Sequence, residues 1–281
     1  MAMLQDDIRK HYESNWQKTD ESAESRENLR YSSPVEDEVL YPAYRELIAD
    51  LQLVTEDTRI LDVGSGSGRW VDFFTKHFRP KSLMGVDFAA AAVRLLNRWY
   101  PSTPRTELKF DVCDITKPDL DLFARFDLIN IANVLFHIPE NDRYVQAVRN
   151  LCNHLAPGGR IVTTEYLPRV SMRTQWMMVR SRYEFEQIIA QAGLKIVETR
   201  AFCFFSNDPM GVEGPDAGVR GNFQRVRAMS QQLLNSASEP GTRAFLVQMM
   251  AEIERACVGF AREHIAEADL PSQKLVVLGA R

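Results

Sequence analysis

Three glycines, Gly64, Gly66 and Gly68, stand two positions apart directly after an apolar run that ends at Val63. Glycine lacks a Cβ atom, so a ligand can come close to the backbone of such a turn. The residues after the turn have a helical pattern, and the first turn of a helix has free N–H groups that bind polar ligand groups. The segment therefore predicts a ligand-binding turn between a strand and a helix, with Ser65 inside it.

Two acidic residues stand beside this turn. Asp87 follows Gly64 by 23 positions and ends a second apolar run, where a carboxylate can accept hydrogen bonds from ribose hydroxyls. Asp62 precedes Gly64 by two positions, where its charge would repel a pyrophosphate and attract the cationic amino acid end of S-adenosylmethionine. The residues therefore indicate a nucleoside site and favour S-adenosylmethionine over NAD, with an NAD-dependent oxidoreductase as the alternative.

Short apolar runs alternate with helical segments over most of the chain. Such alternation is typical of a parallel sheet with helices on both faces, because parallel strands need long crossover connections. The sequence therefore predicts an α/β fold. The predicted strands are 59–63, 82–86, 108–112, 127–131, 160–164, 194–199 and 273–278, and helices are expected from residue 36 and over 70–77, 89–100, 140–155 and 183–192.

The chain divides into four expected parts. An N-terminal arm covers 1–36, and a cofactor-binding core covers 37–203. A helical insertion covers 204–270, and the last strand of the core lies in 271–281. Insertions of this length are more often functional than idle.

The insertion allows two interpretations. Its Met and Phe residues either pack as ordinary core or belong to a lid that lines an acceptor pocket. Its arginines Arg220, Arg225 and Arg227 leave room for an acidic acceptor or for a homodimer contact.

Five segments together resemble the motifs of the class I S-adenosylmethionine-dependent methyltransferases. They are Ile60–Gly68, Gly85–Phe88, Phe110–Ile115, Phe126–Ile138 and Leu155–Arg160. The resemblance covers roughly residues 35–200 and the last strand. It implies a Rossmann-like, doubly wound sheet of seven strands, the last of them antiparallel, and S-adenosyl-L-methionine as the cofactor.

The resemblance also implies individual cofactor contacts. Phe88 is placed to touch the adenine ring, and Asp114 is the acid that faces the adenine amino group. Two aromatic residues of the arm, Tyr12 and Trp16, either close over the cofactor or anchor the arm on the core. The predicted cofactor contacts are Asp62, Gly64, Ser65, Gly66, Gly68, Asp87, Phe88, Asp114, Ile115, Ile131, Tyr12 and Trp16.

Methyl transfer sets what the acceptor side must contain. The acceptor atom has to be aligned and water excluded, and a hydroxyl acceptor also needs a base. Such groups should stand at the carboxyl ends of the strands. We predict three catalytic residues there, His137, Glu165 and Tyr166. His137 is the first candidate for the base, and its alternative is a structural or cofactor-adjacent role. Glu165 and Tyr166 follow the fifth strand.

These features favour a small-molecule methyltransferase that acts on oxygen of a natural-product or sugar-like acceptor. A protein methyltransferase, including an N-terminal one, is the alternative, followed by a non-catalytic S-adenosylmethionine-binding regulatory protein. Enzymes of this fold that methylate amino groups of nucleic acids usually carry a (D/N/S)-P-P-(Y/F) run after the fourth strand. Here that position reads Asn133-Val134-Leu135-Phe136, which argues against base methylation.

Composition and charge argue against nonspecific nucleic acid binding. The 281 residues have a net charge of −4, whereas nonspecific nucleic acid binding depends on clustered Lys and Arg. No apolar stretch approaches the length of a membrane span, and the N-terminus lacks the pattern of a signal peptide. The four cysteines are scattered and no His pair has i, i+4 spacing, so we expect no metal and a cytoplasmic protein.

Overall fold

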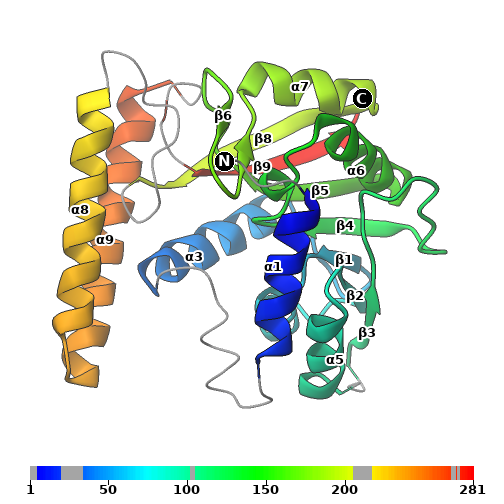
Figure 1. Cartoon of the computed structure of the whole chain (residues 1–281), viewed down its shortest axis with the longest axis horizontal. Helices are drawn as coiled ribbons and strands as arrows, with labels where there is room; N and C mark the ends of the chain where they lie inside the picture. Colours follow the sequence, from blue (N-terminus) through cyan, green and yellow to red (C-terminus); the bar gives the residue numbers. More distant parts are fainter. Residues whose placement is uncertain (1–4, 20–33, 102–104, 205–216, 267–269, 271–272) are drawn as a thin grey trace.

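The computed structural model describes residues 5–19, 34–101, 105–204, 217–266, 270 and 273–281. Its centre is a sheet of seven strands in the order β3-β2-β1-β4-β5-β9-β8 (Figure 1). The strands are β1 (Arg59–Val63), β2 (Ser82–Asp87), β3 (Glu107–Val112), β4 (Phe126–Ile131), β5 (Leu155–Glu165), β8 (Leu194–Cys203) and β9 (Gln273–Ala280).

The strand directions confirm the predicted Rossmann-like sheet. Strands β1 to β5 pair in parallel, whereas β9 pairs antiparallel with both β5 and β8. The register places Asp62 of β1 beside Gly85 of β2 and Asn130 of β4. Because parallel strands end at the same edge, the β1, β2 and β4 tips and the loops that follow them meet there.

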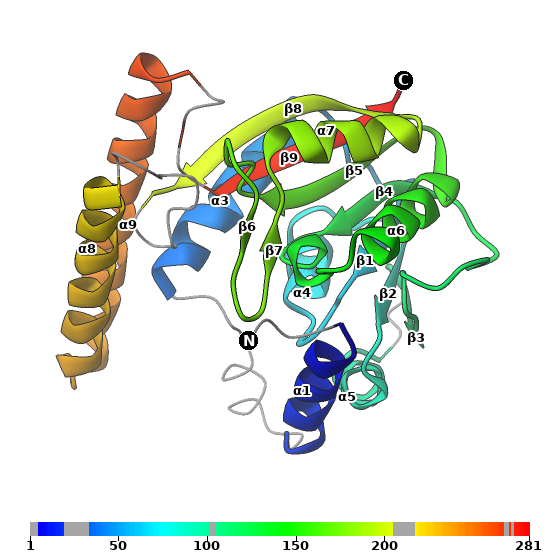
Figure 2. The same cartoon turned by 45° about the horizontal axis from the view of Figure 1, so that its top comes forward.

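Helices cover both faces of the sheet (Figure 2). Side chains alternate along each strand, so Ile60 packs on one face while Leu61 packs on the other. The first face is covered by α3 (Pro34–Asp50), α4 (Arg69–His77), α5 (Ala90–Trp99) and α9 (Pro240–His264), and the second by α6 (Asn141–Asn153) and α7 (Arg182–Gln191). Both faces are therefore buried, which explains the nearly continuous apolar runs of the central strands.

Four further elements surround the carboxyl edge of the sheet. Helix α1 (Gln5–Gln17) packs on α5, and the short helix η1 (Leu135–His137) follows β4. A hairpin of β6 (Met172–Arg173) and β7 (Met178–Val179) lies between β5 and α7 in the chain. Helix α8 (Ala217–Ser236) stands beside α9 at one end of the molecule, in yellow and orange in Figure 1.

The described part of the insertion contains α8 and α9, which contact each other. Helix α9 contacts α3 and β8, on the face of the sheet that carries α4. Within the described part of the chain, no helix is both long enough and apolar enough to cross a membrane.

Candidate active site

The glycine turn after β1 has the conformation that its composition predicts. Gly64, Gly66 and Gly68 have φ angles of 72°, 51° and 78°, in the left-handed region that side chains disfavour. A Cβ atom on Gly68 would also lie 2.2 Å from the ring of Tyr100. The residues from Gly64 to Ser67 line a cavity, whereas Gly68 begins α4 behind it.

Asp87 presents its carboxylate at the tip of β2. Its Oδ2 accepts a hydrogen bond of 3.0 Å from the Gly66 N–H, and its Oδ1 accepts one of 2.9 Å from the Ala89 N–H. These two bonds fix the orientation of the carboxylate and leave further lone pairs on both oxygens. Burial raises the pKa of Asp87 to about 6.

Asp62 lies beneath the glycine turn and is 0% exposed. Its Oδ1 accepts a hydrogen bond of 2.7 Å from Asn130, whose own Oδ1 accepts one of 2.5 Å from the Tyr44 hydroxyl. Its Oδ2 has no hydrogen-bond partner among the described residues. Burial raises the pKa of Asp62 to about 6, so its carboxylate is mostly ionised near pH 7. Asp62 is not among the cavity-lining residues, so this charge lies below the turn.

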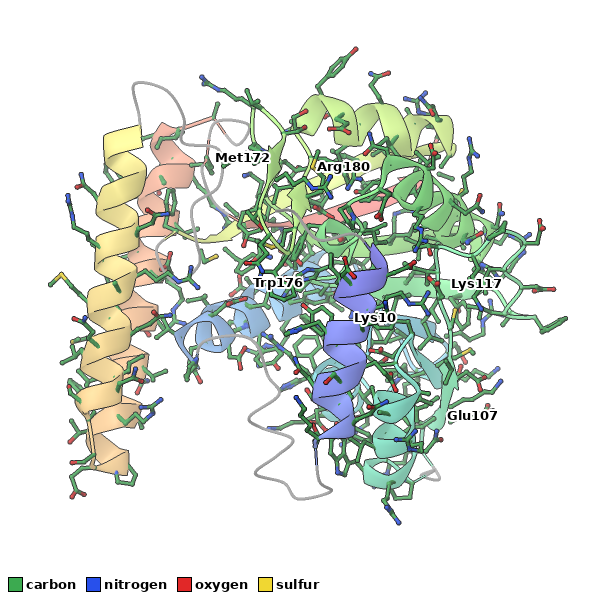
Figure 3. All side chains as sticks on the ribbon, viewed as in Figure 1. Lys10, Glu107, Lys117, Met172, Trp176 and Arg180 are labelled. Carbon is green, nitrogen blue, oxygen red and sulfur yellow. The ribbon has the colours of Figure 1, made fainter. Side chains whose placement is uncertain are left out.

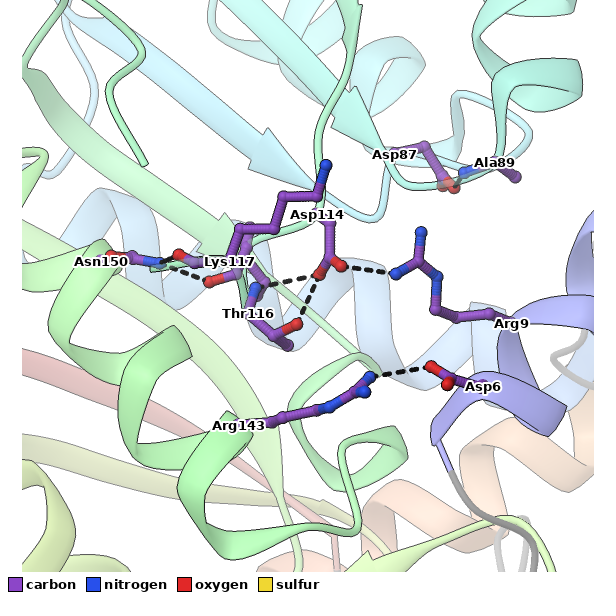
Figure 4. A network of polar contacts seen from close by, with 10 residues as sticks. Asp6, Arg9, Asp87, Ala89, Asp114, Thr116, Lys117, Arg143 and Asn150 are labelled. Carbon is purple, nitrogen blue, oxygen red and sulfur yellow. Dashed lines mark hydrogen bonds and ion pairs between the residues drawn. The ribbon is translucent and has the colours of Figure 1, made fainter. Parts of the chain in front are cut away.

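Phe88, Asp114 and Ile115 line the part of the cavity at the β2 and β3 tips. Asp114 is already engaged: its Oδ2 accepts a bond of 2.6 Å from Arg9 of α1, and its Oδ1 accepts from the Thr116 N–H and hydroxyl (Figure 4). The contact between Asp114 and adenine therefore stays a prediction. Ile131 is fully buried within β4 and does not line the cavity.

Helix α1 forms a wall over this end of the cavity. Trp16 is buried against Ala91, Ala92 and Leu95 of α5 and lies beside Gly66. Tyr12 contacts Phe88 edge to face, with 6.3 Å between the ring centroids. Both side chains line the cavity, so this part of the arm meets the cofactor side of the cavity.

His137 has the geometry of a neutral base. Its Nδ1 lies 3.0 Å from the carbonyl oxygen of Trp176, and because a carbonyl only accepts hydrogen bonds, Nδ1 carries the proton. The unprotonated Nε2 then faces the hydroxyl of Tyr12 at 3.5 Å. Burial lowers the pKa of His137, which keeps the ring neutral near pH 7.

The β6–β7 hairpin is a part of the site that sequence reasoning missed. Trp176, labelled in Figure 3, stands in the turn of this hairpin. Its ring contacts the ring of His11 from α1, with 4.4 Å between the ring centroids. The turn closes with a bond of 2.9 Å from the Thr174 N–H to the Met177 carbonyl and contains no Gly, Asn or Pro. The usual signal of a hairpin turn is therefore absent from the sequence.

Glu165 and Tyr166 face different surroundings although they are neighbours. Tyr166 lines the cavity and packs on Phe136. Glu165 is not among the cavity-lining residues; its Oε1 accepts a bond of 3.3 Å from Thr163, and burial raises its pKa to about 8, an effect that Arg180 opposes. Glu165, predicted as a catalytic residue, is therefore buried outside the cavity lining, whereas Tyr166 lies in it.

The cavity has a volume of about 1030 Å³, at the upper end of the usual range for ligand pockets. It is bounded by α1, the glycine turn, the β4–η1 segment, the hairpin and α8. Of the two interpretations of the insertion, a lid that lines the pocket does not apply to Met229, Met249 and Met250, which are not among the cavity-lining residues. Phe205 and Met210 lie outside the described residues, and the insertion contributes Arg227 and Gln231 instead.

These residues fit S-adenosylmethionine. The backbone of Gly64–Ser67 can hold its amino acid end above the charge of Asp62, and Asp87 can accept hydrogen bonds from its ribose hydroxyls. Phe88 and Ile115 offer apolar surface to a base. When bound, S-adenosylmethionine supplies a methyl group that the positive sulfur activates.

The seven-stranded sheet with an antiparallel last strand is the Rossmann-like fold found in S-adenosylmethionine-dependent methyltransferases. Residues 60–159 match the sequence model of the family described as "Methyltransferase domain". The fatty-acid O-methyltransferase of Mycolicibacterium smegmatis is 25% identical over 153 residues, which are 54% of this chain and 50% of that protein. The chain thus spans about half the length of this curated relative.

Two solved structures share the fold at low sequence identity. An S-adenosylmethionine-dependent methyltransferase from Leishmania major is 16% identical and has a TM-score of 0.55. The match covers 69% of this chain and 76% of that protein's chain. The cyclase SpnF is 15% identical and has a TM-score of 0.52, and the match covers 85% of this chain and 80% of the SpnF chain. At these identities the likeness shows the fold alone.

The raised pKa values of Asp62 and Asp87 predict how cofactor affinity depends on pH. The cationic cofactor favours the ionised carboxylates, so its affinity should fall as the pH is lowered from about 7 through about 6, by up to tenfold per titrating group and pH unit. Calorimetric titration between about pH 5 and about pH 8 measures this dependence. An affinity that is unchanged or higher at low pH contradicts it.

Proposed function

We propose that this protein transfers the methyl group of S-adenosylmethionine to an oxygen atom of a small-molecule acceptor, with His137 as the base. The observation that carries the proposal is the fixed tautomer of His137, whose Nδ1 donates to the Trp176 carbonyl at 3.0 Å. That bond leaves the Nε2 lone pair directed toward the cavity, where Tyr12 is its neighbour. A hydroxyl group placed there could give its proton to Nε2 as it attacks the methyl group.

The shape of the cavity supports a small acceptor. Helix α1 and the hairpin meet above it through His11 and Trp176, which narrows the access of a folded polypeptide. Much of the wall beside His137 is apolar, from Val134, Phe136 and Met177. An apolar wall would limit the access of water to a methyl group bound beside it, and it suits an acceptor with an apolar body. The printed name of the curated relative, a fatty-acid O-methyltransferase, agrees with an oxygen acceptor of this kind.

Each of these residues would have its own role in the methyl transfer. The glycine turn and Asp87 orient the methyl donor, Tyr166 and Phe136 border the acceptor, and His137 takes the proton of the attacking hydroxyl. The Trp176 carbonyl stabilises the imidazolium that results, because Nδ1 keeps its hydrogen bond throughout.

The test is a screen of small hydroxyl and carboxyl compounds with S-adenosylmethionine labelled in its methyl group. We expect label in at least one small compound and none in a panel of folded proteins or peptides, together with calorimetric binding of S-adenosylmethionine but not of NAD. Tight binding of NAD without binding of S-adenosylmethionine overturns the cofactor assignment. Label that enters only peptides overturns the small-molecule assignment.

A further inference from the structure

The charged side chains that line the cavity differ in whether they have hydrogen-bond or ion-pair partners within the protein. Asp87 holds the N–H groups of Gly66 and Ala89, and Asp114 is paired with Arg9. Arg69 forms an ion pair with Asp37, donates from Nε to the Tyr41 hydroxyl at 2.9 Å, and packs on the Tyr41 ring. These groups therefore have hydrogen-bond or ion-pair partners within the protein.

Arg227 differs from the other arginines of this site. It projects from α8 into the cavity lining, and its Nε is buried without a hydrogen-bond partner among the described residues. No described carboxylate pairs with its guanidinium within 4.0 Å. A buried N–H group without a partner costs free energy, so a hydrogen-bond acceptor that binds this guanidinium in the cavity would offset that cost.

The neighbours of Arg227 in the cavity lining are polar. Gln231 lies one turn further along α8, on the same side of the helix, and lines the cavity too. Gln273 comes from the start of β9, and its Nε2 donates to Asn133 Oδ1 at 2.7 Å. A guanidinium with a nearby amide group matches the oxygens of a carboxylate, which accept from several donors at once.

We propose that Arg227 and Gln231 bind a carboxylate group of the acceptor, which makes the acceptor an organic acid with an apolar body. One guanidinium balances one negative charge, which fits a carboxylate better than a doubly charged phosphate monoester. The arginine lowers the nucleophilicity of a carboxylate that it binds, so this group serves recognition, and the reacting oxygen is the one beside His137. The inference rests on the proposed methyl transfer and adds the acceptor class to it.

The experiment compares decanoate, phenylacetate and 4-hydroxybenzoate, each with its own primary amide, on the full chain saturated with S-adenosylhomocysteine. Trp16, Trp70 and Trp176 line the cavity, so their fluorescence reports binding. We expect at least one acid to bind about tenfold more tightly than its amide. Arg227→Gln should abolish this preference, and Arg227→Lys should restore part of it because it keeps the charge.

Arg225→Gln is the matched control. Arg225 stands on the same helix, is exposed and donates to Asn222 rather than lining the cavity, so its replacement should leave the preference for acids unchanged. The inference is overturned if no acid of the series binds better than its amide, or if the preference survives Arg227→Gln. If S-adenosylhomocysteine itself does not bind the wild-type chain, the proposed function fails instead, so the two failures are distinguishable.

Discussion

Replacement of His137 by asparagine should lower kcat by about 10²- to 10⁴-fold, the usual contribution of a general base. The Asn amide can still donate to the Trp176 carbonyl in place of Nδ1, so the β4–η1 segment keeps its link to the hairpin. It has no counterpart of the Nε2 lone pair that faces the cavity. The affinity for S-adenosylmethionine should therefore change little while turnover is lost, and single-turnover methylation together with calorimetry separates the two.

The pH profile gives a second measure of the role of His137. Burial lowers its pKa below the ordinary value of 6.5, so kcat at saturating cofactor should be constant near neutral pH and decline only below about 6.5 as the ring gains a proton. Saturation removes the effect of Asp62 and Asp87 on cofactor affinity. His77 is exposed at the end of α4, and His77→Asn is the matched control that should leave both kcat and its pH profile unchanged. A His137→Asn variant with wild-type kcat excludes this residue as the base.

Asp87→Ala should weaken S-adenosylmethionine binding by about 100-fold, because two hydrogen bonds between ribose hydroxyls and a charged acceptor are lost. The variant also removes the acceptor of the Gly66 and Ala89 N–H groups, so the glycine turn loses part of its support. Calorimetry measures the affinity, and thermal unfolding without ligand shows whether the fold is intact.

Asp111→Ala provides the comparison for Asp87. Asp111 lies on β3 opposite Val86, and Val86 directly precedes Asp87. The side chain of Asp111 is 47% exposed and pairs with Lys109. Its loss should leave cofactor affinity within about twofold, as expected for an exposed ion pair. Equal affinities of the Asp87 and Asp111 variants would show that the ribose does not lie at the tip of β2.

The cofactor half of the site could be predicted from the sequence because local rules place it. Gly64, Gly66 and Asp87 follow strands that read as apolar runs, and the parallel pairing of β1 with β2 brings their ends together. The fold followed from the same alternation of strands and helices. The hydrogen bond from Asn130 to Asp62 could not be predicted from the sequence, because the two residues are 68 positions apart.

The acceptor half was harder to predict because long-range packing decides it. The contact between His137 and Trp176 depends on a hairpin that lacks the usual turn residues, and its neighbour Tyr12 is 125 residues from His137. Arg227 reaches the cavity only through the packing of an inserted helix. Glu165 was predicted on the acceptor side because it follows the predicted fifth strand, but β5 extends to Glu165 and buries it, and of the two residues it is Tyr166 that lines the cavity.

The place of β9 in the sheet has a consequence for the synthesis of the chain. This strand covers residues 273–280 and lies between β5 and β8, which are made much earlier. Until it leaves the ribosome, β5 and β8 each expose an unpaired edge, and such edges can pair with other chains. The seven-stranded sheet is therefore complete only after translation of its last strand, so a chain that stops before residue 273 should be prone to aggregation.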